Sequence, residues 1–516
     1  MSLQISENPL FDYKEIRTGR KSGILLHITS LPSPYGIGTM GAAAREFIDF
    51  LVQANQSYWQ ILPLGPTGYG DSPYQTFSTR AGNPYLIDLD LLLQQGVLRE
   101  DELKRFDFGS DPEKVDFELM WHNRLSLLRQ GWQRVRDGHP SALNKEFENF
   151  KQAEGDDWLH EYALFMSIKS KYQGAPWSDW PDPLRLRDPV KLVEFSEAHR
   201  DDIDFEKFVQ FLFFRQWKQL HDYARNVGID IMGDLPIYVA GDSVEVWSEP
   251  ELFQLDENHT PTFVSGTPPD DYSAGGQLWG SPLFKWELHE ERGFDWWIER
   301  IRFQMRFYDL MRLDHFRGFE SYWAVPYGDE TARRGQWVKG PADKLFDAIK
   351  EELGDLPLFA EDLGYITREV SEFRGRTGFP SMKILQSAFN PDASSDFLPH
   401  NLVEHAVLYT GTHDNDTILG WLKTADPEEI NFAAHYLGLN DEEGKAWGLM
   451  RGAATTVCRT VIYQMQDLLG LGNEARMNVP ATLSGNWQWR MKPGQLTSML
   501  AEKMSELTRI SGRTAQ

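Results

Sequence analysis

The sequence has one cysteine, Cys458, among its 516 residues. One cysteine excludes an intramolecular disulfide and a thiolate metal cluster. Its neighbours Thr456, Val457 and Arg459 lie in a helical-looking stretch, which predicts a buried structural thiol. No apolar run reaches the length of a membrane span, and residues 1–20 are polar, without the apolar core of a signal peptide. These absences predict a cytoplasmic protein that does not enter a membrane.

Basic residues are also scarce, with 52 Lys and Arg against 77 Asp and Glu, for a formal net charge of −25. This charge makes nucleic acid and anionic membrane surfaces poor partners, whereas it does not penalise a neutral polyol. The chain is rich in aromatic residues, with 18 Trp, 18 Tyr and 31 Phe. We expect most of them to build a large core. The remainder would suit sugar binding, because the apolar face of a glucose ring packs on an aromatic plane.

Short apolar runs that end in Gly, Pro or polar residues predict eight strands. They are residues 23–28, 58–64, 229–236, 311–314, 358–361, 381–385, 405–409 and 475–479. Helical patterns lie between most of them, at 42–53, 205–227 and 342–353. Strands that alternate with helices indicate βα units and a parallel sheet. Eight such units predict an α/β protein with a closed (β/α)8 TIM barrel, and we expect residues 1–516 to form one catalytic domain around it.

Two gaps between predicted strands are too long for plain connections. Residues 86–205, between strands 2 and 3, are rich in helix formers and charge and predict a mainly helical insertion. Residues 240–300, between strands 3 and 4, contain a Pro- and Gly-rich loop at 266–277 that we expect to act as an active-site lid. Residues 480–516 follow the last predicted strand. They can supply one closing helix, and no C-terminal β-sandwich domain is expected.

Three acidic residues, Asp314, Glu361 and Asp414, each follow an apolar run. A carboxylate at the end of a buried strand has a desolvation cost that the core does not offset. Active sites of TIM barrels use side chains at the C-terminal ends of the strands, and glycosidic-bond chemistry uses a pair of carboxylates. Each acid alone could be a structural ion pair. Together, with Arg312 and His413 beside them, they predict a catalytic site.

The neighbours of these acids suggest their roles. Residues two apart in a strand face the same way, so Arg312 lies beside Asp314 and favours the ionised form that a nucleophile needs. Burial and the charge of Asp314 would raise the pKa of Glu361, as a general acid requires. A separation of about 5–5.5 Å between these two carboxyl groups would mean a retaining mechanism. Asp414, next to His413, would accept hydrogen bonds from sugar hydroxyls and hold the distorted ring.

Five motifs carry a family resemblance: GDSPYQ at 70–75, GDLPIYV at 233–239, RLDHFRG at 312–318, EDLG at 361–364 and GTHDN at 411–415. In this order, within a similarity that runs from residue 26 to residue 490, they resemble the 4-α-glucanotransferases (amylomaltases, disproportionating enzymes) of glycoside hydrolase family 77, relatives of the α-amylases. The resemblance implies that Asp314 is the nucleophile, Glu361 the acid/base and Asp414 the transition-state stabiliser. Arg312 and His413 would be their neighbours in the −1 subsite.

The resemblance also implies sugar-binding residues. Tyr74 would stack on the −1 glucose, with a buried packing role as the alternative. Further candidates are Trp279 and Gln277 in the donor and acceptor subsites, Asp270 on the same loop, Tyr69 at a secondary glucan-binding spot, and Asp234 as structural support near the pocket. Residues 273–277 read Ser-Ala-Gly-Gly-Gln, where relatives often carry Ser-Glu-Thr-Gly-Gln. Two adjacent glycines predict a looser lid.

The function implied is transfer of α-1,4-glucan segments between malto-oligosaccharides, and to glucose, through a covalent glycosyl-aspartate. One alternative is an α-amylase-like retaining hydrolase, since transfer and hydrolysis would both use Glu361 as the base. Another is a glycan-binding protein on an inactive barrel. We expect no metal and no cofactor, because the mechanism needs neither and no calcium loop of alternating acids is evident. The sequence does not indicate protein partners or oligomeric state. Asp362, Arg317 and Glu320 are expected to make structural contacts only.

Overall fold

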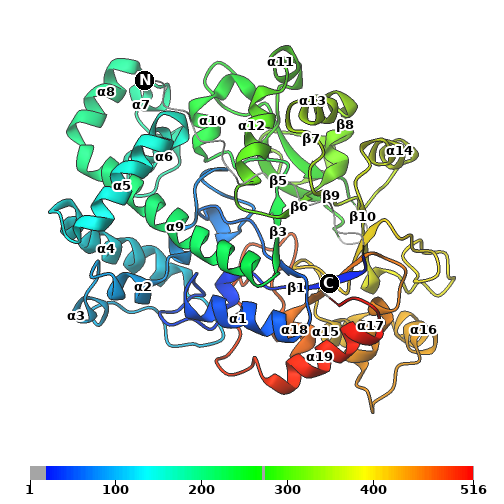
Figure 1. Ribbon diagram of the computed structural model, residues 1–516. Helices are drawn as coiled ribbons and strands as arrows, with labels where there is room; N and C mark the ends of the chain where they lie inside the picture. Colours follow the sequence, from blue (N-terminus) through cyan, green and yellow to red (C-terminus); the bar gives the residue numbers. More distant parts are fainter. Residues whose placement is uncertain (1–18, 270–272, 515–516) are drawn as a thin grey trace.

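The computed structural model describes residues 19–269 and 273–514. Eight parallel strands form a closed barrel in the order β1-β12-β11-β10-β9-β6-β3-β2 (Figure 1). They are β1 (Lys21–Leu25), β2 (Tyr58–Gln60), β3 (Asp230–Leu235), β6 (Leu310–Leu313), β9 (Leu358–Ala360), β10 (Ser381–Ile384), β11 (Ala406–Tyr409) and β12 (Thr460–Gln464). Because β1 pairs with both β12 and β2, the barrel has no open edge. The predicted TIM barrel is therefore confirmed.

The eighth strand is not where the sequence analysis put it. The predicted strand at 475–479 is wrong: Ala475 ends a short 3₁₀ helix, Asn473–Ala475, and no strand follows it in the described residues. The barrel closes instead with β12, whose β-branched and aromatic residues suit a buried strand. Cys458 lies just before β12, beyond the helix that ends at Ala454, so its predicted helical setting is wrong. The thiol is buried, as predicted.

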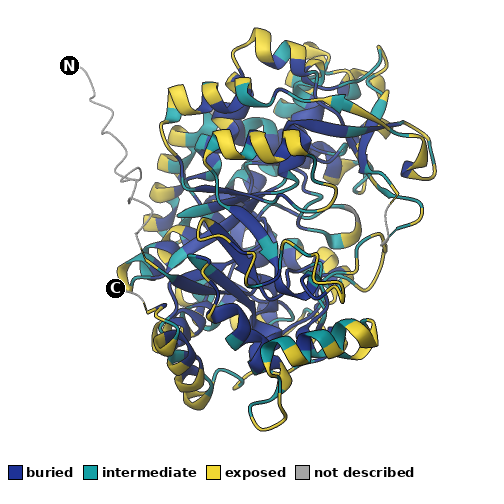
Figure 2. Ribbon diagram, turned by 90° about the vertical axis from the view of Figure 1, so that its right-hand side faces the viewer, coloured by how far each residue is buried: buried dark blue, intermediate teal, exposed yellow. Residues whose placement is uncertain are grey.

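Helices cover the outside of the barrel. They include α1 (Ala42–Gln53), α12 (Asp295–Gln304), α13 (Asp343–Leu353), α14 (Arg368–Thr377), α15 (Ile418–Thr424), α16 (Pro427–Leu437), α17 (Lys445–Ala454), α18 (Met465–Leu468) and α19 (Ser498–Ile510). In α13 the buried residues are Leu345, Phe346 and Ile349, which share one face at helical spacing. Figure 2 shows this pattern generally, with buried strands inside and exposed outer faces on the helices.

The connection between β2 and β3 is helical. It contains α2 (Leu89–Gln94), α3 (Glu100–Leu103), α4 (Phe117–Arg136), α5 (Ser141–Glu154), α6 (His160–Lys171), α7 (Asp182–Arg185), α8 (Pro189–Ala198) and α9 (Arg200–Asn226). Figure 1 shows these helices gathered on one side of the barrel. An aromatic cluster joins α4, α5 and α9, in which Trp132 and Phe208 both pack against Phe147, with ring centroids 5.7 and 5.6 Å from it.

A second, antiparallel sheet was not foreseen from the sequence. It has the strand order β5-β4-β7-β8. The strands are β4 (Phe263–Thr267), β5 (Gln277–Pro282), β7 (Ser321–Pro326) and β8 (Gln336–Lys339), with α10 (Val244–Ser248) and α11 (Trp286–Glu291) in the same part of the chain. Phe263 pairs with Pro326, so the sheet joins segments on either side of barrel strand β6. It brings β5 to the C-terminal end of the barrel.

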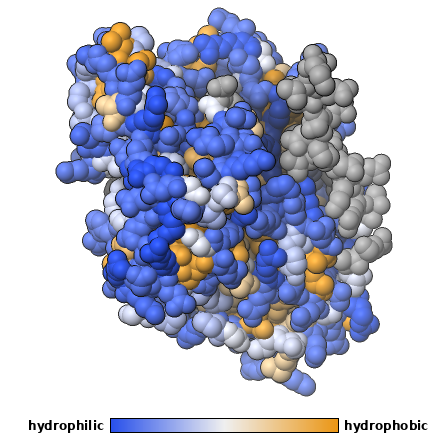
Figure 3. All heavy atoms as spheres, turned by 60° about the vertical axis from the view of Figure 1, so that its left-hand side comes forward, coloured by the Kyte–Doolittle hydropathy of each residue, from blue (hydrophilic) through white to orange (hydrophobic). Residues whose placement is uncertain are grey.

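The face of the molecule drawn in Figure 3 is mainly polar. Figure 3 shows a largely hydrophilic face with small apolar patches, in keeping with the high charge of the chain. None of the helices in the described part of the chain combines the length and apolar character needed to cross a membrane. From residue 465 to residue 514 the chain forms helices and loops.

Candidate active site

Asp314, Glu361 and Asp414 lie at the C-terminal end of the barrel, after β6, β9 and β11. The backbone fixes the first two, since the N–H of Asp314 donates to the carbonyl of Leu235 and that of Glu361 to the carbonyl of Leu313, both at 3.0 Å. The charge of Asp414 acts on both other acids. The structure thus brings the three acids to one site, at the end of a TIM barrel where catalytic residues gather.

Arg312 is the centre of this site. Its side chain is 5% exposed, and its Nη1 lies 2.6 Å from Oδ2 of Asp234 and 2.9 Å from Oδ1 of Asp314. Its Nη2 lies 3.7 Å from Oε2 of Glu361. Arg312 and Asp314 point the same way, as their spacing in the strand predicted. One buried guanidinium therefore contacts three carboxyl groups at the C-terminal ends of three neighbouring strands, and it influences both their orientation and their charge.

Glu361 is held as a protonated acid near neutral pH. Burial raises its pKa to about 8; Arg312 and the backbone N–H of His315 oppose this shift, and the charges of Asp314 and Asp414 add to it. The His315 N–H donates to Oε2 of Glu361 at 2.5 Å. The prediction that burial and Asp314 would raise this pKa is confirmed in direction. A carboxyl group protonated at pH 7 can donate a proton to a leaving group.

Asp314 has a different environment. Burial also raises its pKa, Arg312 lowers it, and Asp414 raises it further, so burial outweighs the guanidinium that we expected to dominate. Arg312 is nevertheless closer to Asp314, at 2.9 Å, than to Glu361, at 3.7 Å. When these two carboxyl groups hold one proton between them, the closer ion pair keeps Asp314 ionised and the proton stays on Glu361.

Tyr74 and Asp234 support the site from the side of β3. The hydroxyl of Tyr74 donates to Oδ2 of Asp234 at 2.7 Å. The Asp234 side chain is fully buried, and burial raises its pKa while its contact with Arg312 opposes the shift. The ring of Tyr74 stacks on His413, with centroids 5.1 Å apart and planes at 23°. Tyr74 is only partly buried, so part of this stack is accessible to solvent.

The sequence analysis missed the residues that hold Asp414. Nδ2 of Asn478 donates to Oδ1 of Asp414 at 2.6 Å, and Nη2 of Arg476 donates to the backbone carbonyl of Asp414 at 2.6 Å. The backbone N–H of Asn478 donates to the carbonyl of His413 at 3.1 Å. The two polar residues alternate in the segment that was taken for a strand. The spacing of Arg476 and Asn478, two residues apart, was the sequence signal that both side chains could contact one partner.

Comparisons with known proteins identify the family. The sequence profile of glycoside hydrolase family 77, described as 4-alpha-glucanotransferase, matches residues 26–497. The chain belongs to this family. A 4-alpha-glucanotransferase from Clostridium butyricum is 48% identical over 490 residues, which cover 95% of this chain and 100% of that protein. One from Thermus thermophilus is 48% identical over 485 residues, covering 93% and 96%.

Solved structures agree with this assignment. The amylomaltase from Streptococcus agalactiae, determined in complex with acarbose, has a TM-score of 0.93 at 41% identity and covers 96% of this chain and 100% of that one. The amylomaltase from Corynebacterium glutamicum, at 19% identity, has a TM-score of 0.76 over 96% of this chain and 75% of that one, and shares the fold.

In this family 77 chain, Trp279 and Gln277 lie on β5 beside the acid pair. Nε1 of Trp279 donates to Oε1 of Gln277 at 3.2 Å, and the Trp279 ring packs edge-on against His315 with centroids 4.7 Å apart. His315 in turn donates to Glu361, so these residues adjoin the acid. Asp270 lies outside the described residues. The side chain of Tyr69 also lies outside them, while its backbone begins a short 3₁₀ helix, Tyr69–Asp71.

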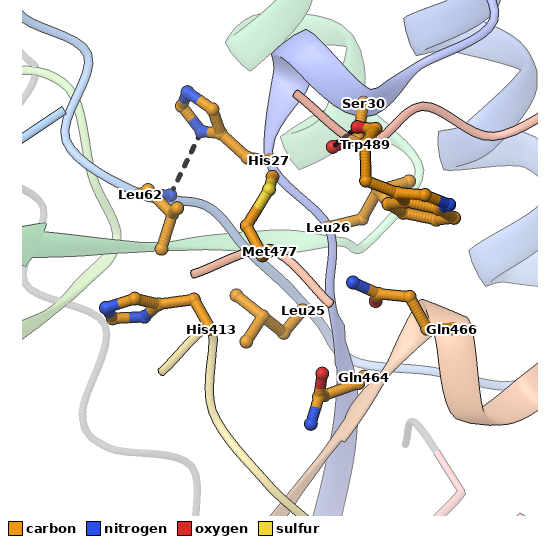
Figure 4. Close-up of a pocket in the computed structure, with 10 residues that line it drawn as sticks. All are labelled: Leu25, Leu26, His27, Ser30, Leu62, His413, Gln464, Gln466, Met477 and Trp489. Carbon is orange, nitrogen blue, oxygen red and sulfur yellow. Dashed lines mark hydrogen bonds between the residues drawn. The ribbon is translucent and has the colours of Figure 1, made fainter. Parts of the chain in front are cut away.

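Two uncharged histidines lie at the same end of the barrel, His27 after β1 and His413 beside Asp414. His27 and His413 line one small pocket together with the amides of Gln464 and Gln466 (Figure 4). Burial lowers the pKa of His27 to about 3 and that of His413 to about 4. Nδ1 of His27 accepts from the N–H of Leu62 at 3.2 Å, as the dashed line in Figure 4 marks. His27 therefore carries its proton on Nε2, and both rings add hydrogen-bonding groups without adding charge.

The remaining acids and cations near the motifs make structural contacts, as expected. Asp362 accepts from the N–H of Met382 at 2.8 Å and pairs with Nε of Arg374 at 2.9 Å. Glu320 pairs with Lys339. In the described ranges, no group of three or more His, Cys, Asp or Glu side chains is arranged to hold a metal ion.

Proposed function

We propose that this chain is a retaining 4-α-glucanotransferase that moves α-1,4-glucan segments between malto-oligosaccharides and onto glucose. The observation that carries the proposal is the pair of carboxyl groups of Asp314 and Glu361. Both contact the guanidinium of Arg312, Asp314 at 2.9 Å and Glu361 at 3.7 Å. Such a pair supplies both the nucleophile and the general acid that a retaining mechanism needs. Membership of family 77 supports the substrate class, and so does a similar amylomaltase bound to acarbose.

In the first step, the Asp314 carboxylate attacks the anomeric carbon of the −1 glucose. Glu361 donates its proton to the glycosidic oxygen, and the bond to the reducing-end segment breaks. The products are a covalent glycosyl-aspartate and a released segment with a new 4-hydroxyl. Arg312 orients Asp314 throughout, because its other contact, at 2.6 Å to Asp234, fixes the guanidinium.

In the second step, Glu361, now ionised, accepts a proton from the 4-hydroxyl of an acceptor. The freed oxygen attacks the anomeric carbon, the ester bond to Asp314 breaks, and a new α-1,4 bond forms. Two inversions give overall retention. Asp414, fixed by Asn478, is placed to bind hydroxyls of the −1 ring and to stabilise the positive charge of the transition state.

Water could also discharge the intermediate, which would make the enzyme an α-amylase-like hydrolase. The catalytic acids serve both outcomes, so the choice depends on how well an acceptor competes with water. A bound acceptor gains a large effective molarity over free water when sugar-binding side chains hold it in place. We propose that Trp279 and Gln277 contribute to this binding, because they adjoin Glu361 through His315.

The test is to incubate the purified protein with maltotriose and to follow glucose and longer products by chromatography. We expect glucose together with a ladder of products longer than maltotriose, and loss of both in Asp314→Asn. Maltose and glucose without longer products would favour the hydrolase. Binding without turnover would favour an inactive glycan-binding protein.

We also propose that residues 1–516 act as one catalytic unit, in which 86–205 and 240–300 are insertions into the barrel and 266–277 is the lid loop. Truncation of an insertion would test this assignment. Loss of maltotriose disproportionation would support one catalytic unit, whereas unchanged disproportionation would show that the insertion is dispensable. A cytoplasmic location stays a prediction, which rests on the single cysteine, the polar residues 1–20 and the lack of an apolar run as long as a membrane span.

A further inference from the structure

The loop after the acid/base carries an aromatic residue that is held out toward solvent. Tyr365 follows Glu361 by four residues and is 70% exposed. Gly364 precedes it with φ of +78°, a conformation that glycine adopts without strain and that turns the chain at this point. A single exposed aromatic is common on protein surfaces and explains nothing alone. Here, however, other contacts determine its position.

Arg317 holds this loop through the backbone of Tyr365. The arginine is 4% exposed; its Nη1 donates to the backbone carbonyl of Tyr365 and its Nη2 to Oγ of Ser321 at 2.9 Å. Its guanidinium lies 3.8 Å from the ring centroid of Trp337 and 5.9 Å from that of Tyr365. A buried guanidinium between two aromatic rings is a rigid support, because it is stacked and hydrogen-bonded at the same time.

The supported rings form a surface at the rim of the barrel. Trp337, on β8, is 38% exposed, and it packs against Trp323 with ring centroids 5.1 Å apart. Tyr365 and Trp337, with Arg317 between them, are called here the aromatic platform. Flat, rigid and partly exposed aromatic rings are what the apolar face of a glucose unit requires.

The position of the platform decides which part of a glucan it would meet. A general acid lies against the glycosidic oxygen that joins the −1 and +1 rings. The polypeptide segment that follows Glu361 therefore begins near the +1 ring, on the acceptor side of the site. The platform is linked to Glu361 twice: Tyr365 follows it in sequence, and the N–H of Phe316, next to Arg317, donates to the Glu361 carbonyl at 3.1 Å.

We propose that Tyr365 is an acceptor-side stacking residue for α-1,4-glucans, held in place by Arg317 and Trp337. The assignment rests on the proposed function, since it takes Glu361 as the acid/base. The ring binds a glucose unit beyond the first acceptor subsite. It therefore favours acceptors of several units over glucose, and it raises the occupancy of acceptor relative to water.

One experiment measures initial transfer rates with maltotriose as donor and labelled glucose or maltotetraose as acceptor. In Tyr365→Ala we expect the acceptor KM for maltotetraose to rise about tenfold, as for the loss of one stacked ring, and that for glucose to rise less. Tyr365→Phe keeps the ring and retains the wild-type KM. The matched control is Tyr327→Ala, because Tyr327 is 56% exposed but follows the far end of β7.

A second experiment needs no turnover. In the Asp314→Asn background, calorimetry with maltoheptaose compares Tyr365 with Tyr365→Ala, and we expect about tenfold weaker binding for the alanine variant. Equal affinity, or an equal maltotetraose KM in Tyr365→Ala and Tyr327→Ala, would overturn the proposal. Absence of a product ladder from the unmodified enzyme would instead overturn the proposed function. The calorimetric comparison with maltoheptaose would still show whether Tyr365 contributes to glucan binding.

Discussion

Replacement of Glu361 by glutamine should make the folded protein more stable as it makes the enzyme inactive. Glutamine has the shape of a protonated glutamate, and its amide oxygen can still accept from the N–H of His315, which bonds Glu361 at 2.5 Å. The glutamine is neutral in the folded and the unfolded chain. Glutamate, by contrast, must take up a proton when the chain folds at neutral pH.

The pKa of Glu361 gives the size and sign of this effect. Burial raises the pKa from its ordinary 4.5 to about 8. The stability associated with the bound proton is complete below the unfolded value and is lost as the pH rises toward the folded one. At 1.36 kcal/mol for each pH unit, uptake of the proton at pH 7 costs about 3 kcal/mol, and at pH 5 less than about 1 kcal/mol. The advantage of Glu361→Gln should therefore grow between pH 5 and pH 8.

Urea unfolding of both proteins at pH 5, 6, 7 and 8 would measure this difference. Glu351→Gln, at an exposed position of α13, is the matched control, and its stability should follow that of the wild type at every pH. The reasoning would be refuted if Glu361→Gln and the wild type changed in parallel over this range. Transfer from maltotriose should be absent in Glu361→Gln and unchanged in Glu351→Gln.

Three further predictions concern the same site. The rate of transfer should fall as the pH rises through about 8, because Glu361 loses the proton that it donates; a pH profile of kcat/KM with maltotriose would show the descending limb. Asn478→Ala should lower kcat about tenfold with a smaller change in KM, since Asp414 loses a hydrogen bond of 2.6 Å; steady-state kinetics would measure it, with exposed Asn440→Ala as control. Asp234→Asn should destabilise the fold by about 2 kcal/mol, because it weakens the shortest of the three carboxyl contacts of Arg312; thermal unfolding would detect it, and an unchanged Tm would contradict the role given to this pair.

The parts of the fold that follow from local sequence were predictable. The barrel strands before Asp314 and Glu361 are short apolar runs with a carboxylate at the end. In the helix between them, α13, the apolar residues recur at helical spacing. The helix predicted at 42–53 has the bounds Ala42–Gln53 in the structure. An apolar run and the carboxylate that ends it are only a few residues long, so the sequence around each strand is enough to recognise both.

The antiparallel sheet could not be predicted in the same way. Its central pair, β4 and β7, joins residues about sixty positions apart, with barrel strand β6 between them in the chain. Neither strand can complete its backbone hydrogen bonds until the other is in place, and the sequence around one strand does not reveal its distant partner. The segment at 475–479 misled for the opposite reason: its alternation of polar and apolar residues fits a strand, but Arg476 and Asn478 use their polar groups to hold the loop of Asp414.

The pKa shifts of the proposed catalytic acids share two causes, their burial and the charges around them. Arg312 is one positive charge among Asp234, Asp314, Glu361 and Asp414, and the nearby histidines are neutral because burial lowers their pKa. Burial, with the charges of Asp314 and Asp414 added to it, keeps the proton on Glu361, which is the condition for the proposed protonation of the leaving group. Once the leaving group departs, the negative charges of Asp314 and Asp414 face an oxocarbenium-like centre and stabilise it. The destabilisation of the folded protein that Glu361→Gln should relieve and the stabilisation of the transition state therefore arise from one buried arrangement of carboxyl groups.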